Sequence, residues 1–323
     1  MPKAENGKAN NGKGSPGVLL SVNDLCMYFD SAGRRVKASE HISFDICEGE
    51  TFGLVGESGS GKSTIGKCII GLNHPTSGSI TFRGQELTGI KSRKEYIEKT
   101  KYIQMIFQDP MSSLNPKKTV GQILREALEI QHVGKDREER NRLVSEAMKK
   151  VGIPPEYSGR YPSGFSGGQR QRIGIARALV GDPKLIIADE CIAALDASVQ
   201  AQIVNMLRRI KEETGTSLLF ISHDLSMVRF LSDRIGVLHL GYLLEIGRSE
   251  ELFENPIHPY TKGLLGAIPR MNPVVPSDQD SRYDPVSAGI DYALGSWHEL
   301  SDTHRVLCTD SEFEDWTKGG EEE

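Results

Sequence analysis

The chain has 323 residues, of which 37% are hydrophobic and 26% are charged, and this length accommodates one large α/β domain plus an extension. Its net charge of −5 gives no electrostatic reason to expect nucleic acid as a partner. No apolar run approaches the roughly 20 residues that span a bilayer, and residues 1–17 hold no apolar segment of signal-peptide length. These observations predict a soluble, cytoplasmic chain.

The five cysteines are widely scattered and include no C-x-x-C pair. This spacing argues against a disulfide framework, a zinc site and a cysteine-ligated iron–sulfur cluster. We therefore expect each cysteine to be a small buried hydrophobic side chain. The positions are Cys26, Cys47, Cys68, Cys191 and Cys308.

The N-terminal third reads as a disordered tail followed by short strands. Residues 1–17 are rich in Gly, Asn and Lys, which predicts disorder. Turn residues then separate short β-like runs up to about residue 87. The predicted strands are Val18–Val22, Ile42–Ile46, Thr51–Val55 and Ser79–Phe82, and a helix over 61–72 follows the third of them.

The middle of the chain changes to helices without intervening strands. Apolar residues keep helical spacing between residues 119 and 151, and Pro154-Pro155 ends this pattern. We predict a helical subdomain, over about 111–168, inserted in the α/β core.

Strands and helices alternate again after the helical subdomain. We expect helices over 168–180, 197–213 and 225–232, strands over 184–189 and 217–222, and then a hairpin of Ile235–Leu240 and Tyr242–Ile246. Alternation of this kind predicts a mostly parallel sheet with helices on both faces. Beyond residue 269 the chain is polar and Pro-rich. Trp297 and Val306-Leu307 are candidates for anchoring part of an extension over 271–323, whose last ten or so residues are expected not to fold.

Gly56 to Ser63 fit the phosphate-binding pattern G-x-x-x-x-G-K-[ST] between a predicted strand and a predicted helix. The glycines let backbone N–H groups converge on phosphate oxygens where a Cβ would intrude, and the following helix adds its N-terminal dipole. Lys62 is suited to reach the β- and γ-phosphates, and the Ser63 hydroxyl to ligate Mg²⁺. This strand–loop–helix predicts a P-loop NTPase core.

The apolar run Leu185–Ala188 ends in two carboxylates, Asp189 and Glu190. A buried parallel strand reads this way, and ligands bind at the carboxyl ends of such strands. Asp189 is suited to hold Mg²⁺ directly or through water, and Glu190 to orient and polarise an attacking water. The pair alone could be an ordinary surface turn, but the P-loop favours the catalytic interpretation.

A second phosphate-related segment, Phe165-Ser166-Gly167-Gly168-Gln169, opens a predicted helix. We call it the signature segment. Together with the P-loop, Gln108, Asp189-Glu190, Ala194-Leu195-Asp196 and His223, it makes the order of motifs resemble that of ABC-transporter ATPase subunits over residues 18–270. The resemblance implies a fold with a P-loop core, an antiparallel β subdomain and the helical subdomain, and it implies ATP and Mg²⁺ as cofactors.

The resemblance also implies a head-to-tail dimer in which the signature segment of one subunit contacts the nucleotide on the P-loop of the other. Ser166, Gly167, Gly168 and Gln169 would make that contact, since a helix N-terminus suits an anion. Asp196 would line the dimer interface. Gln108 would touch Mg²⁺ and report its state to a membrane partner, and His223 would contact the γ-phosphate and the attacking water.

The adenine base needs an aromatic partner, which the resemblance assigns to Phe29, with adjacent Tyr28 as the competitor; either could instead be a core residue of a strand. The full predicted nucleotide-binding set is Phe29, Gly56, Glu57, Ser58, Gly59, Ser60, Gly61, Lys62, Ser63, Thr64 and Gln108, and the predicted metal ligands are Ser63, Gln108 and Asp189.

The chain departs from the family pattern at three places. Phe165 stands where many members have Leu, Cys191 where Pro is common after the catalytic Glu, and Ala193 where Ser is frequent. None of these removes a group needed for phosphoryl chemistry, so we expect a hydrolytic site with Glu190 and His223 as its catalytic residues.

Three segments are similar to the oligopeptide and dipeptide branch of bacterial importers, namely Ile103–Pro110, Ser113–Pro116 and Asn255–Lys262. The tail from about residue 283 to residue 307 resembles that of the oligopeptide-permease ATPase that works beside a non-identical ATPase. Some relatives hold an iron–sulfur cluster in a cysteine-rich C-terminal segment, whereas this chain has only Cys308 there, so we expect no such cluster. The implied partners are a second, non-identical ATPase, two transmembrane permease subunits and an extracytoplasmic solute-binding protein, with the chain peripheral on the cytoplasmic face of the membrane.

Other interpretations stay open from sequence alone. The same branch also imports nickel, glutathione and other small solutes. ATPases that act on DNA carry a long coiled coil between the motifs, whereas about a hundred residues separate Gly56 from Phe165. Ribosome-associated factors carry two ATPase cassettes on one chain, and this chain has one.

Overall fold

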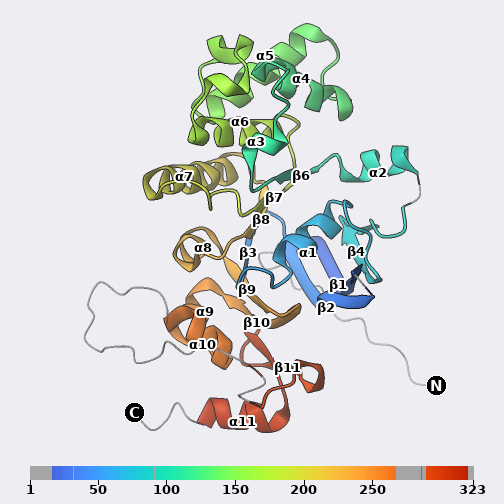
Figure 1. Ribbon diagram of the computed structural model, residues 1–323, viewed down its shortest axis with the longest axis vertical. Coiled ribbons are helices and arrows are strands. Elements are labelled where there is room, and N and C mark those ends of the chain that lie inside the picture. Colours follow the sequence, from blue (N-terminus) through green and yellow to red (C-terminus); the bar gives the residue numbers. More distant parts are fainter. Residues whose placement is uncertain (1–16, 32, 91, 267–284, 286–288, 319–323) are drawn as a thin grey trace, which may run out of the picture.

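The structure, a computed structural model, describes residues 17–31, 33–90, 92–266, 285 and 289–318 (Figure 1). Residues 1–16 of the predicted tail, and residues 271–284, 286–288 and 319–323 of the predicted extension, lie outside this part. The molecule is elongated. A helical subdomain occupies one end, the sheet core with its β subdomain the middle, and the C-terminal extension the opposite end (Figure 1).

The β subdomain is a four-stranded antiparallel sheet in the order β2-β1-β4-β5. Its strands are β1 (Val18–Ser31), β2 (Arg34–Cys47), β4 (Ser77–Phe82) and β5 (Gln85–Glu86). β1 and β2 are longer than predicted because irregular pairing between Val22 and Tyr28 interrupts the apolar alternation of β1, and residues 34–37 of β2 are exposed. Cross-strand pairing, such as Phe29 opposite Val36, extends the hairpin there.

The main sheet has the order β11-β12-β10-β9-β3-β8-β7-β6. Its strands are β3 (Thr51–Val55), β6 (Ile103–Ile106), β7 (Leu185–Asp189), β8 (Ser217–Ile221), β9 (Arg234–His239), β10 (Tyr242–Arg248), β11 (Ser296–Glu299) and β12 (Arg305–Cys308). The five strands from β9 to β6 are parallel, and β10, β12 and β11 add an antiparallel edge. Every residue of β3, β7 and β8 is buried, which confirms the predicted buried parallel sheet.

Helices cover both faces of this sheet, as predicted. α1 (Lys62–Ile69) buries its apolar side in the cluster that also contains the β subdomain. α7 (Ala197–Thr214) and α8 (Leu225–Leu231) pack in the other cluster, on the opposite face. α2 (Arg93–Thr100), which the sequence analysis did not predict, precedes β6. The sheet is therefore the middle layer, and its carboxyl edge is where β3 meets the P-loop.

The helical subdomain contains α3 (Pro110–Ser113), α4 (Val120–Ile130), α5 (Arg137–Lys150), two short 3₁₀ turns (Pro155–Gly159 and Pro162–Gly164) and α6 (Gly167–Leu179). Thr119 and Gln122 form a reciprocal capping box at the start of α4, and Asp136 caps α5. Val120, Ile123, Leu124 and Leu128 are all buried, so the helical spacing correctly identified the core face of α4.

The C-terminal part contains α9 (Ser249–Glu254), α10 (Pro259–Gly266), a 3₁₀ turn η3 (Tyr292–Leu294), β11, β12 and α11 (Asp310–Lys318). β12 pairs with β10, and Val306 is fully buried as the predicted anchor. The expectation that the last ten or so residues do not fold is wrong for the part that α11 covers. Phe313 and Trp316 pack against the small cluster around Val306, contacts that acidic composition alone does not reveal.

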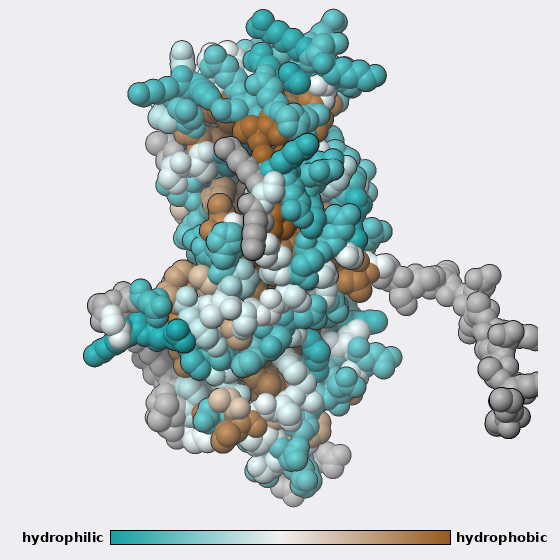
Figure 2. Space-filling model, turned by 90° about the vertical axis from the view of Figure 1, so that its right-hand side faces the viewer, coloured by the Kyte–Doolittle hydropathy of each residue, from teal (hydrophilic) through white to brown (hydrophobic). Residues whose placement is uncertain are grey.

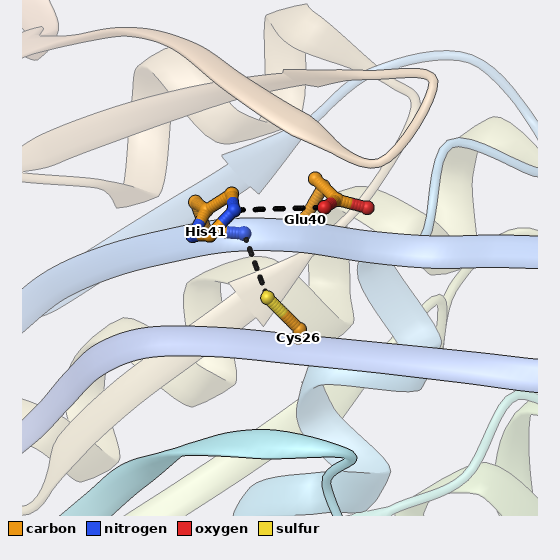
Figure 3. Close-up of side chains that lie close together, drawn as sticks. All are labelled: Cys26, Glu40 and His41. Carbon is orange, nitrogen blue, oxygen red and sulfur yellow. Dashed lines mark hydrogen bonds and ion pairs between the residues drawn. The ribbon is translucent and has the colours of Figure 1, made fainter. Parts of the chain in front are cut away.

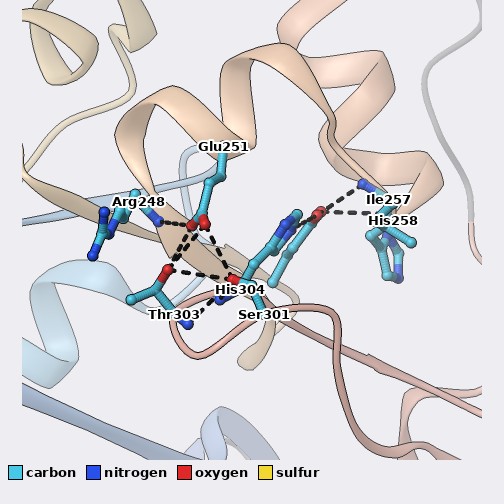
Figure 4. Close-up of polar contacts among 8 residues, drawn as sticks. Arg248, Glu251, Ile257, His258, Ser301, Thr303 and His304 are labelled. Atoms are coloured by element: carbon cyan, nitrogen blue, oxygen red, sulfur yellow. Dashed lines mark hydrogen bonds and ion pairs between the residues drawn. The ribbon is translucent and has the colours of Figure 1, made fainter.

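Buried polar contacts attach this extension to the core (Figure 4). Glu245 on β10 is fully buried and its Oε1 lies 2.8 Å from Nε2 of His304. Glu251 on α9 accepts hydrogen bonds from the hydroxyls of Thr303 and Ser301. Because an unpaired buried charge is costly, the pair of Glu245 and His304 fixes the extension in one register on β10, and the partly exposed contacts of Glu251 attach it to α9.

His258 makes the stability of this region dependent on pH. Burial lowers its pKa from 6.5 to about 3. Between these values the unfolded chain binds a proton that the folded chain does not, so this group destabilises the fold as the pH falls through 6.5. We expect it to remove about 2 kcal/mol of unfolding free energy between pH 7 and pH 5. Urea unfolding of the native chain and of His258→Gln at both pH values measures this, and an equal pH dependence in the two would contradict it.

Among the described residues no helix is both long and apolar enough to cross a membrane. One side of the molecule, seen in Figure 2, is mainly hydrophilic, with hydrophobic residues in small separate patches.

Candidate active site

The P-loop joins β3 to α1 through residues whose backbone only glycine adopts without strain. Gly56 has φ +149°, and a Cβ there would lie 1.9 Å from the carbonyl oxygen of Leu238. Gly61 has φ +108°, and its Cβ would lie 2.1 Å from the carbonyl oxygen of Ala38. Both neighbours are backbone atoms, one at the end of β9 and one on β2, so a side chain could be admitted only by moving one of these elements or the loop. The loop is therefore confined between β9 and β2, whose backbones leave no room for side chains at these two positions.

Lys62 is 3% exposed, and its side chain folds back on the P-loop backbone. Its ammonium donates to the carbonyl oxygens of Gly56, at 2.8 Å, and Glu57, at 2.7 Å. Burial lowers the pKa of Lys62, whereas the carboxylates of Glu190 and Asp189 oppose that shift. The cation is thus bound to the P-loop backbone and is stabilised by the predicted catalytic carboxylate, Glu190, and the predicted metal ligand, Asp189.

The other predicted loop residues lie between the β9–β10 turn and solvent. Ser60 is buried and its carbonyl oxygen accepts from the N–H of Gly241. Ser58 and Gly59 are exposed, and Thr64 is half-buried in the first turn of α1. The outer rim of the loop is consequently open to a ligand, while its inner side is fixed.

Ser63 and Asp189 lie together although 126 residues separate them. The Ser63 hydroxyl donates to Oδ1 of Asp189 at 2.6 Å. Asp189 is 5% exposed, and burial raises its pKa. A hydroxyl and a carboxylate form the type of oxygen donor set that Mg²⁺ prefers.

Glu190 stands at the centre of the predicted catalytic residues. Nε2 of Gln108 donates to its Oε2 at 3.0 Å, and Nδ1 of His223 lies 3.7 Å from its Oε1. Glu190 has φ +42°, a left-handed conformation that costs a non-glycine residue about 1–2 kcal/mol. Its N–H donates to the carbonyl oxygen of Ile221 on β8, which holds this strained backbone. Strain of this kind is characteristic of functional sites.

Residues from four predicted motifs therefore meet at one place. The structure brings together the P-loop (Lys62 and Ser63), Gln108, the carboxylate pair Asp189-Glu190, and His223. The P-loop follows β3, Asp189-Glu190 stand at the end of β7 and His223 follows β8, all of them predicted strands, whereas β6, which precedes Gln108, was not predicted.

The signature segment lies apart from this site. Ser166 and Gln169 form a reciprocal capping box at the start of α6, at 3.3 and 3.0 Å. A Cβ on Gly168 would lie 2.8 Å from Val199, whereas one on Gly167 would meet nothing. Figure 1 shows α6 among the helices of the subdomain, at a distance from α1. Within this chain the segment does not complete the P-loop site.

Asp196 has a visible structural role at the start of α7. Its Oδ1 accepts from the N–H of Val199 at 3.0 Å and from the hydroxyl of Ser198 at 2.7 Å. These hydrogen bonds lower the pKa of Asp196. The side chain is thus an N-cap of the helix, and its predicted place at a dimer interface stays a prediction.

The two candidate aromatics for adenine differ in accessibility. The hydroxyl of Tyr28 donates to Glu40 at 2.8 Å, and Lys37 and Arg35 lie over its ring. Phe29 is 40% exposed. Since stacking needs a free ring face, the structure favours Phe29, the predicted residue.

Glu40 also belongs to a compact group with Cys26 and His41 (Figure 3). Their potential ligand atoms lie within 4.8 Å of one another. However, Tyr28 and Lys37 already engage the Glu40 carboxylate, and the N–H of His41 donates to the Cys26 sulfur at 3.3 Å. These contacts join β1 to β2 next to the adenine candidates, which is a structural role.

The sequence analysis missed one contact to the P-loop. The N–H of Glu57 donates to the hydroxyl of Tyr260 at 3.1 Å. Tyr260 lies on α10 within Asn255–Lys262, a segment that carried family resemblance but no assigned role. No local sequence pattern reveals this contact. Once the fold is known, the burial of Tyr260, which is 1% exposed, points to it, because a buried hydroxyl needs a partner.

Comparison with known proteins agrees with this geometry. A family model described as "ABC transporter" matches residues 39–193, and one described as "Oligopeptide/dipeptide transporter, C-terminal region" matches 244–284. The chain is 50% identical to the oligopeptide transport ATP-binding protein OppF of Bacillus subtilis (strain 168), over 91% of this chain and 97% of that protein. It is 47% identical to the oligopeptide transport ATP-binding protein AmiF of Streptococcus pneumoniae serotype 4, over 93% and 98%.

A similar solved structure is the dimeric post-hydrolysis state of the ATP-binding cassette MJ0796 bound to ADP and Pi. It matches with a TM-score of 0.65 and 27% identity, over 72% of this chain and 99% of that chain. The fold, the assembled P-loop site and near-complete coverage of close relatives lead to one conclusion: this chain belongs to the ABC-transporter ATP-binding proteins, in their oligopeptide-transport branch, and is an ATPase.

Proposed function

We propose that this chain hydrolyses ATP to power the import of oligopeptides or dipeptides. The observation that carries the proposal is Glu190, held between Gln108 and His223 beside the Lys62 ammonium. The names of the relatives and the matched C-terminal region supply the solute class.

The chemistry needs an activated water in line with the γ-phosphate. The Glu190 carboxylate orients that water and accepts its proton, and His223 contacts the water and the γ-phosphate. Lys62 neutralises negative charge on the transferred phosphoryl group. Ser63, Asp189 and Gln108 would hold Mg²⁺, since all three offer oxygen atoms, and the ion would screen the phosphate charge when bound.

A second ATPase subunit completes the site. Ser166, Gly167 and Gly168 stand at the N-terminus of α6, where backbone N–H groups and the helix dipole attract an anion. Because this segment does not reach its own P-loop, it is available to a nucleotide held by a partner. The dimeric cassette of the solved relative supports this arrangement, and the resemblance of the C-terminal tail favours a non-identical partner.

The remaining partners follow from transport. ATP binding closes the two ATPase subunits and draws their Gln108 loops together, and this motion is passed to two permease subunits. Hydrolysis through Glu190 reopens the dimer. The chain works on the cytoplasmic face of the membrane, and an extracytoplasmic solute-binding protein selects the solute.

Affinity purification of the chain from its own detergent-solubilised membranes tests this proposal. We expect two membrane proteins and a second ATPase to co-purify, and the solute-binding protein encoded beside them to bind oligopeptides. A binding protein that instead takes nickel or glutathione would overturn the solute while keeping the transporter. Recovery of ribosomes or DNA-bound proteins without a membrane protein would overturn transport altogether.

A further inference from the structure

The peptide unit between Gly56 and Glu57 is held from both sides. Its carbonyl oxygen accepts from the Lys62 ammonium at 2.8 Å, and its N–H donates to the Tyr260 hydroxyl at 3.1 Å. Tyr260 is 1% exposed and lies 203 residues further along the chain. A phosphate-binding loop depends on the directions of successive N–H groups, so whatever fixes this peptide plane also sets the entrance of the loop.

The ring of Tyr260 is fixed in turn by His239. The two rings stack with centroids 4.1 Å apart and planes 25° apart. His239 ends β9, next to Leu238, whose carbonyl oxygen approaches Gly56. Nδ1 of His239 lies 2.7 Å from the hydroxyl of Tyr292, which belongs to η3 in the C-terminal extension. One continuous set of contacts thus runs from the extension to the P-loop.

The backbone of Tyr260 depends on the extension as well. Its N–H donates to Nδ1 of His258 at 3.0 Å. The carboxylate of Glu245 accepts from the N–H groups of Ile257 and His258 and is paired with His304 (Figure 4). His304 lies beyond η3, so the extension contacts this unit at two separate points.

We propose that Tyr260 is a positioning residue for the P-loop, and that Tyr292 sets its position through His239, so that the C-terminal extension tunes the affinity of this chain for ATP. Tyr260 does not touch the reacting atoms. It preorganises the loop, which lowers the cost of ordering the loop when phosphate binds. The inference rests on ATP binding by the P-loop and is independent of the transported solute.

The test is Tyr260→Phe in the full chain, with ATP affinity measured by calorimetry. Phenylalanine keeps the ring on His239 and removes only the hydroxyl. Loss of one such hydrogen bond should weaken ATP binding about five- to tenfold. In the assembled transporter we expect KM for ATP to rise by the same factor while kcat stays within about twofold. A merely structural role would lower the melting temperature and leave KM unchanged.

Tyr292→Phe tests the link to the extension and should weaken ATP binding in the same direction by a smaller factor. In the double variant the two effects should not add, because both act through one contact path. Tyr102→Phe changes a half-buried tyrosine away from the loop and is the matched control.

Native ATP affinity in Tyr260→Phe would overturn the positioning role. Native affinity in Tyr292→Phe, or additive effects, would overturn the coupling to the extension. Should Tyr260→Phe prove unstable, weakened ATP binding in a stable Tyr292→Phe would support the path from the extension through Tyr260, and native affinity would overturn it. Failure of the native chain to bind ATP would instead contradict the assignment of the P-loop as an ATP-binding site.

Discussion

Replacing Glu190 with glutamine is expected to preserve ATP binding and to lower the rate of hydrolysis about 10²–10⁴-fold. The amide has the shape of the carboxylate but cannot accept a proton from water. It can still hydrogen-bond Gln108, and it removes a negative charge from the neighbourhood of the phosphates. ATP affinity should therefore stay equal or increase, while turnover falls.

Steady-state ATPase rates and equilibrium ATP binding, measured on the same preparation, separate the two effects. Glu213→Gln, on the exposed end of α7, is the matched control and should keep both at native values. Near-normal turnover in Glu190→Gln would remove Glu190 from its role as the base, and a parallel loss of ATP binding would point to a role in folding the site.

Replacing Gly61 with alanine is expected to destabilise the chain by about 3 kcal/mol and to abolish nucleotide binding. Its φ of +108° is strained for any residue with a Cβ, and that atom would lie 2.1 Å from the backbone oxygen of Ala38. Backbone strain costs about 1–2 kcal/mol, and forced overpacking adds about 1–3 kcal/mol. Either β2 or the start of α1, which carries Lys62 and Ser63, must move.

Gly59→Ala separates the effect of backbone strain from that of the steric clash at Gly61. Gly59 also has a positive φ, +83°, but a Cβ there meets nothing within 4 Å. Urea unfolding without nucleotide should show a loss of about 1 kcal/mol for Gly59→Ala and a clearly larger loss for Gly61→Ala. Equal losses in the two variants would contradict the close approach of β2 to the loop.

The sequence predicted the parts of the site that are local in the chain. The P-loop lies within one strand–loop–helix unit, and Asp189-Glu190 follow a strand that is wholly buried. The meeting of Glu190 and His223 was also predictable, because each follows a predicted strand and carboxyl ends of parallel strands share one edge of the sheet. Gln108 was placed by family resemblance alone, since no strand was predicted before it. Periodicity correctly located the core face of α4.

Contacts between distant segments could not be predicted in this way. The hydrogen bond from Glu57 to Tyr260 depends on the packing of α10 against the loop, which no local pattern encodes. The far end of the β1–β2 hairpin is held by cross-strand pairing, and its apolar residues do not follow the strict alternation that identifies a strand. α11 is stabilised by Phe313 and Trp316 on a cluster formed by remote residues.

Side chains with two roles are a separate difficulty. Ser166 and Asp196 are N-caps in this chain, and the same exposed helix starts are the groups proposed to meet a partner's nucleotide and interface. Sequence motifs identify such positions without revealing which contact determines the residue type.

We propose that ATP hydrolysis at Glu190 drives oligopeptide import. Uptake of a labelled oligopeptide into cells of the source organism that lack this chain tests it directly, after complementation with the native sequence or with Glu190→Gln at equal expression. We predict that the native chain restores uptake and that the variant does not. Equal uptake in cells that carry the native chain and in cells that carry Glu190→Gln would contradict this proposal. Native uptake in cells that lack both chains would contradict it as well.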